Sequence, residues 1–416
     1  MKQNQKLKIT GTIVKPKFKG TKLEIEKILK ERDATIHLMP GGYRPVVTVF
    51  GKTLPEVWET SVLATYLYGI DIKTHYDKPG DPPSKDCKMT MVIQNPFQEP
   101  RLHRCFPAGL NVLEIYRQEV IEGVHDHWIA PKEGKWTYTY HKRLFDYILT
   151  NDAEEQNKFF VKFNPKITAL RDYFRSIIAD EKNKIAPVVY AFVKDIAAVE
   201  ASGDVVIKLK EMFRKYSSLF ENVDENSFIE KINSICFIDP ILPSHSEKME
   251  EVHGINQIDY IIDELSAAPY SRRAEGITWM PTADPQTNDP PCLQRVWCRM
   301  FPDRHGQQVL NTDTDWRSRD SYGAAFMNIF ALTDLQKCIA QRISEKIKEP
   351  VKIGPYTDSS NSYHIYGKDH VAFEKFLESI LKRKFKDRVW TSEFAKDIFE
   401  EERKQLAENP DYAFKR

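Results

Sequence analysis

The sequence lacks the features that mark a secreted, membrane-spanning or metal-binding chain. Its six cysteines are scattered and form no CxxC pair, which argues against a disulfide framework or a zinc site and fits a reducing cytosol. No apolar run approaches the roughly 20 residues that cross a bilayer. The first residues, Met1 to Lys6, also lack the apolar core of a signal peptide. We therefore expect a cytoplasmic protein with no membrane contact and no metal.

A strong excess of either charge is missing as well. The chain holds 61 Lys and Arg against 60 Asp and Glu, a net charge of +1. Such a balance gives no overall field that would attract nucleic acid, so we expect no nucleic-acid partner. Repeats and low-complexity runs are also absent. A chain of 416 residues can bury a large core and hold two or three domains.

Hydrophobic spacing divides the chain into four segments. Residues 1–35 are lysine-rich and are expected to form an arm or a hairpin. Residues 36–149 alternate strand and helix patterns, with strands at 46–50 and 89–93 and a helix at 54–68. Residues 150–247 carry only helical spacing and are expected to form an inserted subdomain of roughly four helices. Residues 248–416 resume the α/β pattern, with strands expected at 277–280, 293–300, 311–315, 351–356 and 362–366 and helices at 254–265, 322–347 and within 371–406.

One cysteine lies between two arginine clusters. Cys292 follows Pro290-Pro291, with Arg272-Arg273 upstream and Arg317 downstream. Nearby guanidinium groups lower a thiol pKa, and the thiolate is the nucleophilic form. Arginine is also preferred for phosphate binding, because its planar guanidinium group can donate two parallel hydrogen bonds. An isolated cysteine of this kind is more often a small buried hydrophobe, so the order and spacing of the flanking residues carry the argument.

That order resembles the signature series of thymidylate synthases. The series reads Ser271-Arg272-Arg273, Trp279, Pro290-Pro291-Cys292, Arg317-Ser318-x-Asp320, Asn328 and His364-Ile365-Tyr366. It covers residues 255 to 380 well and 95 to 147 more loosely, and it is closest to the divergent archaeal-type branch. The resemblance implies an α/β (α+β) fold, a mixed sheet packed by helices, into which the helical subdomain is inserted.

The resemblance also implies a role for each matching residue. Cys292 would be the nucleophile, and Arg317 with Ser318 would bind the phosphate of a pyrimidine nucleoside monophosphate. Arg272 and Arg273 match a pair that serves the neighbouring subunit's site, which implies a homodimer. The remaining matches are Asn328 for the pyrimidine edge, Asp320 for the ring and cofactor, and His364 with Tyr366 for the sugar 3'-hydroxyl.

Proton transfer is expected from a helix near residue 114 and a tyrosine segment near residue 140. Within the helical pattern of residues 113 to 121, Glu114 and Glu119 lie on different faces, so at most one points into a cleft. We take Glu114 first and Glu119 second, and a solvated carboxylate is an equally good interpretation of either. Tyr140 matches the family's phenol near the ring C5, and a core aromatic is the alternative.

These matches favour transfer of a one-carbon unit from 5,10-methylenetetrahydrofolate to C5 of dUMP, giving dTMP through a Cys292–C6 adduct. Asn328 favours uracil, because its amide can serve the O4 and N3–H edge. A hydroxymethylase of dUMP or dCMP is the alternative, and a non-catalytic nucleotide-binding homologue is a third hypothesis. A modified pterin carrier stays open, because several positions depart from the bacterial-type pattern: Leu293, Trp316, Ala324 and Ser362, with Arg44 only a weak match to the N-terminal arginine loop.

Overall fold

The computed structural model describes residues 8–10, 21–74, 76–130, 135–147, 169–170, 173–174, 176–178, 192, 205–220, 222–236, 254–281 and 283–412. Its contacts divide the chain into two compact units. The first unit joins Met1–Tyr147 to Ile255–Arg416, and the second is Ile148–Gly254. Segments from both ends of the chain thus form one compact unit.

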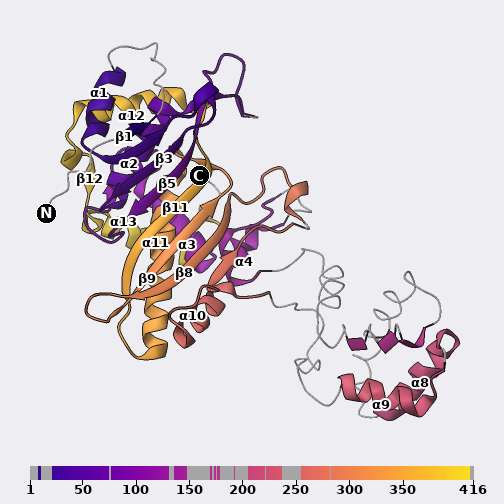
Figure 1. Ribbon diagram of the computed structural model, residues 1–416. Helices are drawn as coiled ribbons and strands as arrows, with labels where there is room; N and C mark the ends of the chain where they lie inside the picture. Colours follow the sequence, from indigo (N-terminus) through magenta and orange to yellow (C-terminus); the bar gives the residue numbers. More distant parts are fainter. Residues whose placement is uncertain are drawn as a thin grey trace. The chain divides into compact units, whose positions relative to one another are not determined.

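A mixed sheet organises the first unit. Its strands run in the order β1-β2-β3-β5-β11-β9-β8-β7, with β4 beside β5 and β10 beside β11 (Figure 1). Strands β3 and β5 are parallel, as are β9 and β11, whereas β5 and β11 are antiparallel. The bounds are β1 Lys8–Thr10, β2 Asp33–His37, β3 Val46–Gly51, β4 Ile70–Ile72, β5 Ser84–Ile93, β7 Glu275–Ile277, β8 Leu293–Pro302, β9 Gln308–Trp316, β10 Arg319–Asp320 and β11 Lys352–Ile365.

Helices pack in layers against this sheet. Helix α2 contacts β3, β5 and β11, α11 contacts β9 and β11, and α10 contacts β8. Helix α3 packs on α11, and α13 packs on α3. The helices of this unit are α1 Thr21–Lys30, α2 Leu54–Tyr68, α3 Leu110–Glu122, α4 Tyr140–Phe145, α10 Gln257–Ala267, α11 Ala325–Ile347, α12 His370–Lys382 and α13 Ser392–Glu408.

The burial pattern follows from the two periodicities of the sequence. Along β8, Val296, Cys298 and Met300 are buried toward the helices, whereas Arg295 on the alternate face is exposed. Helix α11 buries most of its residues between Ala325 and Ile343, because neighbouring helices lie on several sides of it. The expected α/β fold, a mixed sheet packed by helices, is confirmed.

Two local expectations differ from the structure. Residues 351–356 and 362–366 were expected as separate strands, but they belong to the single strand β11, which carries a register shift between Ser360 and Tyr363. Polar Asp358 and Ser360 resemble loop residues, yet both are fully buried. At the N-terminus, β1 pairs with β2 in parallel, and helix α1 comes between the two strands in the sequence. These elements therefore do not form a hairpin.

The second unit has its own apolar core. Helices α8 (Val205–Tyr216) and α9 (Glu225–Cys236) pack around aromatic residues that include Phe174, Phe192 and Phe228. Phe228 contacts Phe192 with ring centroids 5.8 Å apart and Phe174 at 6.4 Å. Helices α8 and α9 agree with the helical spacing expected within residues 150–247, and most of residues 150–204 lie outside the described residues.

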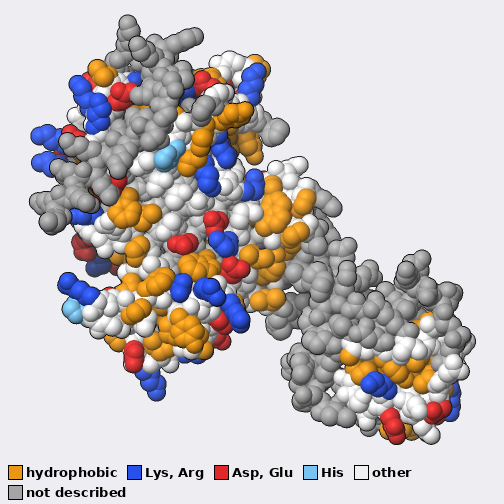
Figure 2. All heavy atoms as spheres, viewed as in Figure 1, with side chains coloured by type: hydrophobic (Ala, Val, Ile, Leu, Met, Phe, Trp, Pro, Cys, Tyr) orange, Lys and Arg blue, Asp and Glu red, His pale blue; other side chains and the backbone are white. Residues whose placement is uncertain are grey.

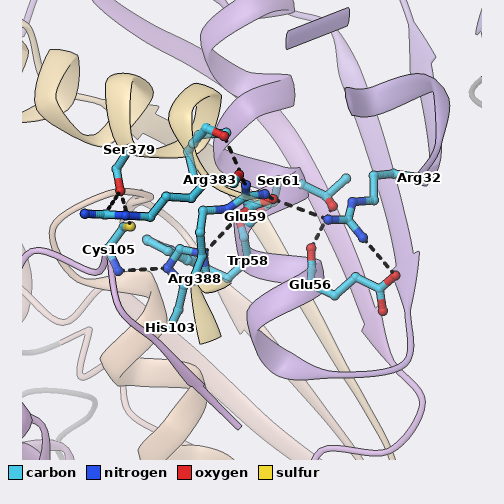
Figure 3. Close-up of polar contacts among 12 residues, drawn as sticks. Arg32, Glu56, Trp58, Glu59, Ser61, His103, Cys105, Ser379, Arg383 and Arg388 are labelled. Atoms are coloured by element: carbon cyan, nitrogen blue, oxygen red, sulfur yellow. Dashed lines mark hydrogen bonds and ion pairs between the residues drawn. The ribbon is translucent and has the colours of Figure 1, made fainter. Parts of the chain in front are cut away.

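A buried ionic network joins α2 to a small second sheet of β6 (Leu102–His103) and β12 (Val389–Trp390) (Figure 3). Glu59 accepts hydrogen bonds from Arg388 Nη2 at 2.6 Å and Nε at 2.7 Å, and its Oε2 lies 2.9 Å from His103 Nε2. Burial alone would raise the pKa of Glu59, but His103 and Arg388 bring it to about 2. The network ties the C-terminal region to the first half of the fold.

The surface of the described chain shows no segregation of charge on the face viewed in Figure 2, where basic and acidic side chains are interspersed. Among the described helices, none is long and apolar enough to cross a membrane. The described residues also contain no group of three or more His, Cys, Asp or Glu side chains that could hold a metal ion.

Candidate active site

Cys292 lies directly before β8, at the point where the chain leaves the Pro290–Pro291 turn. Its carbonyl oxygen accepts a hydrogen bond from the backbone N–H of Arg317 at 2.9 Å. Strands β8 and β9 are paired beside it, with Leu293 opposite Trp316. The thiol is half-buried. The sheet thus holds the cysteine at a strand end, where a side chain is fixed but still accessible.

The side chain of Arg317 turns back over the same turn. Its Nε donates to the carbonyl of Pro291 at 2.9 Å, and its Nη2 donates to that of Pro290 at 2.5 Å. This places a guanidinium group beside the thiol. Behind it, Arg319 donates to the buried carboxylate of Asp358, and its guanidinium lies 4.0 Å from the centre of the Trp316 ring. The Arg319–Asp358 pair is buried and supports the site from the sheet side.

The thiol pKa differs from the sequence expectation. Burial raises the pKa of Cys292 above its ordinary value of 9.0, and Asp289 adds to the rise. Arg317 and Arg319 act in the expected direction and lower it, but burial is the larger effect. The direction expected for the arginines is thus present, but it does not outweigh the effect of burial.

Three phenols interact electrostatically with Cys292. Burial is the main cause of a raised pKa for Tyr138, Tyr140 and Tyr366, and the electrostatic influence of Cys292 contributes to each of them. The Tyr140 hydroxyl accepts a hydrogen bond from the backbone N–H of Leu293 at 3.3 Å. Tyr140 therefore lies next to Cys292, and its raised pKa keeps the phenol protonated at neutral pH.

Asn328 lies on the first turn of α11 and is buried. Its Nδ2 donates a hydrogen bond to the Tyr116 hydroxyl at 2.6 Å. Burial raises the pKa of Tyr116 well above its ordinary value, and Tyr140 and Glu119 contribute. This contact connects Asn328 through Tyr116 to Tyr140, and hence to the surroundings of Cys292.

The two candidate glutamates have different surroundings. Glu114 is fully buried, and its carboxylate accepts from Arg117 at 2.8 and 2.6 Å and from Gln118 at 2.9 Å, with Arg403 of α13 at 3.6 Å. Its oxygens are thus committed to the α3–α13 contact and are not brought to the thiol. Glu119 instead influences Tyr116 and lies 3.0 Å from His125 Nδ1.

The sugar-contact candidates lie at the end of β11. His364 is buried, and its ring lies 4.4 Å from that of Tyr366. Burial raises the pKa of Asp320 to about 6, and its Oδ1 accepts from the backbone N–H groups of Tyr322 at 3.1 Å and Gly323 at 2.8 Å. Asp320 also influences the pKa of Tyr366. Asp320 and His364 are also paired across strands β10 and β11, so these residues lie together at the end of β11.

The remaining candidates are at the surface. The side chains of Arg272 and Arg273 are exposed, and no described contact brings them to Cys292 of the same chain. Ser318 follows Arg317 and is half-buried. Arg44 is exposed, with Nη1 3.8 Å from Asp86 Oδ1.

Sequence reasoning missed four residues of this region. Tyr116 and His125 come from the helix and loop that carry Glu119, and they give no signal because they belong to no recognised tripeptide. Asp358 and Asp86 are polar residues within strands β11 and β5, where alternation alone would not predict buried carboxylates. A charged residue within a strand pattern is the one signal that could have indicated them.

A half-buried thiol beside a guanidinium group and three protonated phenols defines a candidate site for covalent catalysis on an anionic, ring-containing ligand. Comparison with known proteins shows a partial similarity. The family model of thymidylate synthase matches residues 215–407.

Individual relatives agree with this match. A protein named "Putative thymidylate synthase" from Methanosarcina barkeri is 31% identical over 138 residues, covering 33% of this chain and 58% of the relative. One of the same name from Methanocaldococcus jannaschii is 36% identical over 134 residues, covering 31% and 55%. The chain thus spans a little over half the length of these curated relatives. The crystal structure of thymidylate synthase from T4 phage matches with 25% sequence identity and a TM-score of 0.26. The match covers 32% of this chain and 41% of the phage chain. Over residues 215–407 the chain is therefore similar to thymidylate synthases.

Proposed function

We propose that the protein transfers a one-carbon unit to C5 of a pyrimidine nucleoside monophosphate, with dUMP as substrate and dTMP as product. The observation that carries the proposal is the environment of Cys292, where a half-buried thiol meets Arg317 and the phenols of Tyr140 and Tyr366. The match to thymidylate synthases over residues 215–407 supports it.

The nucleophilic step would begin when the Cys292 sulfur adds to C6 of the uracil ring. A sulfur–C6 bond forms, the C5=C6 electron pair moves toward O4, and C5 becomes nucleophilic. This is covalent catalysis, which divides one difficult step into easier ones. The neighbouring arginines make the thiolate accessible, because their charge opposes the effect of burial on the thiol pKa.

Asn328 supports uracil over cytosine. One Nδ2 proton of its amide is donated to Tyr116, which leaves Oδ1 as an acceptor and a second Nδ2 proton as a donor. Uracil offers N3–H to the acceptor and O4 to the donor. Cytosine presents a bare N3 that would face Oδ1, so it fits this orientation less well.

Proton removal from C5 would involve Tyr140 and the pair Glu119 with His125. Glu119 holds His125 Nδ1 at 3.0 Å, and the buried Nε2 of His125 has no hydrogen-bond partner among the described residues. Glu114 was the first sequence candidate, and its carboxylate is instead held by Arg117, Gln118 and Arg403. We therefore assign the proton transfer to the neighbourhood of Glu119.

A reduced folate such as 5,10-methylenetetrahydrofolate, or a modified pterin, would supply both the methylene unit and the hydride that reduces it to the methyl group of dTMP. Asp320 fits the N–H groups of such a ring, because both backbone hydrogen bonds it accepts end on Oδ1, and Oδ2 can take a further donor. The exposed Arg272 and Arg273 suit a phosphate site completed by a second copy of the chain, so we also propose a homodimer.

Mass spectrometry of the nucleotide product tests the proposal. Purified protein is incubated with dUMP or dCMP and 5,10-methylenetetrahydrofolate, beside Cys292→Ser and the matched control Cys338→Ser, which removes a half-buried thiol of α11. A methyl group gained by dUMP with wild type and Cys338→Ser, and not with Cys292→Ser, is expected. A hydroxymethyl product would establish the hydroxymethylase instead, and equal product from Cys292→Ser would overturn the covalent mechanism.

A further inference from the structure

Asp86 and His364 lie directly opposite each other on the antiparallel strands β5 and β11. Side chains at such positions share one face of the sheet, with Cβ atoms roughly 5 Å apart. Ser362 precedes His364 by two residues and so lies on the same face. Asp86 and His364 are each only 4% exposed, so a polar atom of either side chain that lacks a hydrogen-bond partner is costly.

The hydrogen bonds in this group define the tautomer of the imidazole. Ser362 Oγ donates its proton to Asp86 Oδ2, and the same Oγ lies 3.3 Å from His364 Nδ1. A hydroxyl carries one proton, so Ser362 can only accept from His364. His364 therefore carries its proton on Nδ1, and burial keeps the ring neutral by lowering its pKa to about 4.

This arrangement leaves Nε2 of His364 as a bare acceptor. That atom is buried and has no hydrogen-bond partner among the described residues. A buried acceptor without a partner costs free energy unless a donor is supplied. Its ring lies 4.4 Å from Tyr366, and Tyr366 is influenced electrostatically by Cys292. His364 is also paired with Asp320 of β10, and Arg317 in the same segment bonds through its backbone N–H to the Cys292 carbonyl, so the acceptor lies near the segment that would bind the proposed nucleotide.

We propose that Asp86 is a positioning residue for the sugar of the nucleotide: through Ser362 it holds His364 in the tautomer whose Nε2 accepts a hydrogen bond from a sugar hydroxyl. This inference rests on the proposed function, because it takes the ligand to be a nucleotide.

Asp86 has a second neighbour, Arg44, and the experiment must distinguish its effect from that of Ser362. Arg44 Nη1 lies 3.8 Å from Asp86 Oδ1, so an effect of Asp86 on binding could come from this ion pair alone. Arg44→Gln removes the ion pair and leaves Ser362 in place. Ser362→Ala removes the hydroxyl between Asp86 and His364, and Ser362→Thr keeps it. Asp86→Ala removes both contacts, so its effect on binding is interpreted only in comparison with these three variants.

Binding of two nucleotides measures sugar recognition. We would titrate dUMP and 2',3'-dideoxyuridine monophosphate, which lacks only the 3'-hydroxyl, into wild type and each variant by calorimetry. Wild type should prefer dUMP roughly tenfold, as expected for one net hydrogen bond. Ser362→Ala and Asp86→Ala should reduce the preference to about twofold or less, whereas Ser362→Thr and Arg44→Gln keep it. A merely structural effect would weaken both nucleotides equally.

A second measurement needs no nucleotide. Nitrogen-15 NMR of the histidine-labelled free protein reports which ring nitrogen of His364 is protonated. We expect Nδ1–H in wild type and a mixture of tautomers in Ser362→Ala. An Nε2–H tautomer in wild type, or an unchanged dUMP preference in Ser362→Ala, would overturn the inference. If wild type binds neither nucleotide, the proposed function fails together with it, whereas tight dUMP binding with an unchanged preference overturns the inference alone.

Discussion

Asn328 of α11 donates a hydrogen bond to the hydroxyl of Tyr116 of α3 at 2.6 Å. The two helices pack against each other, and this contact is the polar link between them at the candidate site. It orients an amide whose remaining donor and acceptor would, in the proposed function, meet the pyrimidine ring. In that proposal, recognition of the base depends on a phenol that itself need not touch the ligand.

Tyr116→Phe tests this link. Without the hydroxyl, the Asn328 amide loses a buried partner, and we expect turnover of dUMP to fall about tenfold and the preference for dUMP over dCMP to narrow. Tyr68→Phe is a matched control, because its buried hydroxyl has no hydrogen-bond partner among the described residues. Equal losses in the two variants would contradict the role given to Tyr116.

Substitution of Glu114 should lower stability, and substitution of Glu119 should lower activity. Glu114→Gln weakens the buried contacts with Arg117 and Arg403, so we expect the free energy of unfolding to fall by about 1–3 kcal/mol with little change in turnover. Glu119→Gln should lower turnover by about 100-fold or more, the range typical of proton-transfer groups. Thermal unfolding and product formation measured on the same samples decide this, and the reverse ranking would return the role to Glu114.

The thiol of Cys292 should react slowly at neutral pH in the free protein. Because burial raises its pKa above 9.0, the thiolate fraction and the rate of alkylation should keep rising to beyond about pH 9. Arg317→Gln removes a charge that lowers the pKa, so alkylation at a given pH should slow further. Peptide mapping after iodoacetamide treatment measures the rate, with Cys338 as internal control. A rate for Arg317→Gln equal to or above wild type would argue against this electrostatic assignment.

Glu59 should make stability depend on acid pH. Its folded-state pKa of about 2 lies below the ordinary 4.5, so its stabilising effect is fully present above 4.5 and is lost as pH falls toward 2. Between these values we expect unfolding free energy to drop by roughly 3 kcal/mol. Urea unfolding from about pH 7 to about pH 3 should show a shallower pH dependence for Glu59→Gln than for wild type. Identical curves would mean that the network around Glu59 (Figure 3) does not titrate as described.

Local periodicity predicted much of the fold, because long elements carry their pattern within one stretch of chain. Helix α2 was expected at 54–68 and has those bounds. Strand β11 was divided in two, since Asp358 is stabilised by Arg319 and Trp316, which no local pattern reveals. Buried polar residues are predictable only when their distant partners are known.

The candidate site shows the same limit. Short motifs single out Cys292, Arg317 and Asn328. In the structure the backbone N–H of Arg317 bonds to the Cys292 carbonyl, and Asn328 bonds to Tyr116. Spacing on a helix could not choose between two glutamates, because the choice depends on Arg403 from the last helix. The thiol pKa was also beyond sequence reasoning, since burial is a property of the packed chain.

The most direct test of the central claim is to trap the bond between Cys292 and C6. In 5-fluoro-dUMP the C5 hydrogen is replaced by fluorine, which cannot leave as a proton, so a covalent complex formed with 5,10-methylenetetrahydrofolate should accumulate. Mass spectrometry of the digested protein should find the nucleotide on the peptide that contains Cys292, and Cys292→Ser should give no adduct. An adduct on another cysteine, or none in a protein that binds dUMP, would contradict the assignment of Cys292 as the nucleophile.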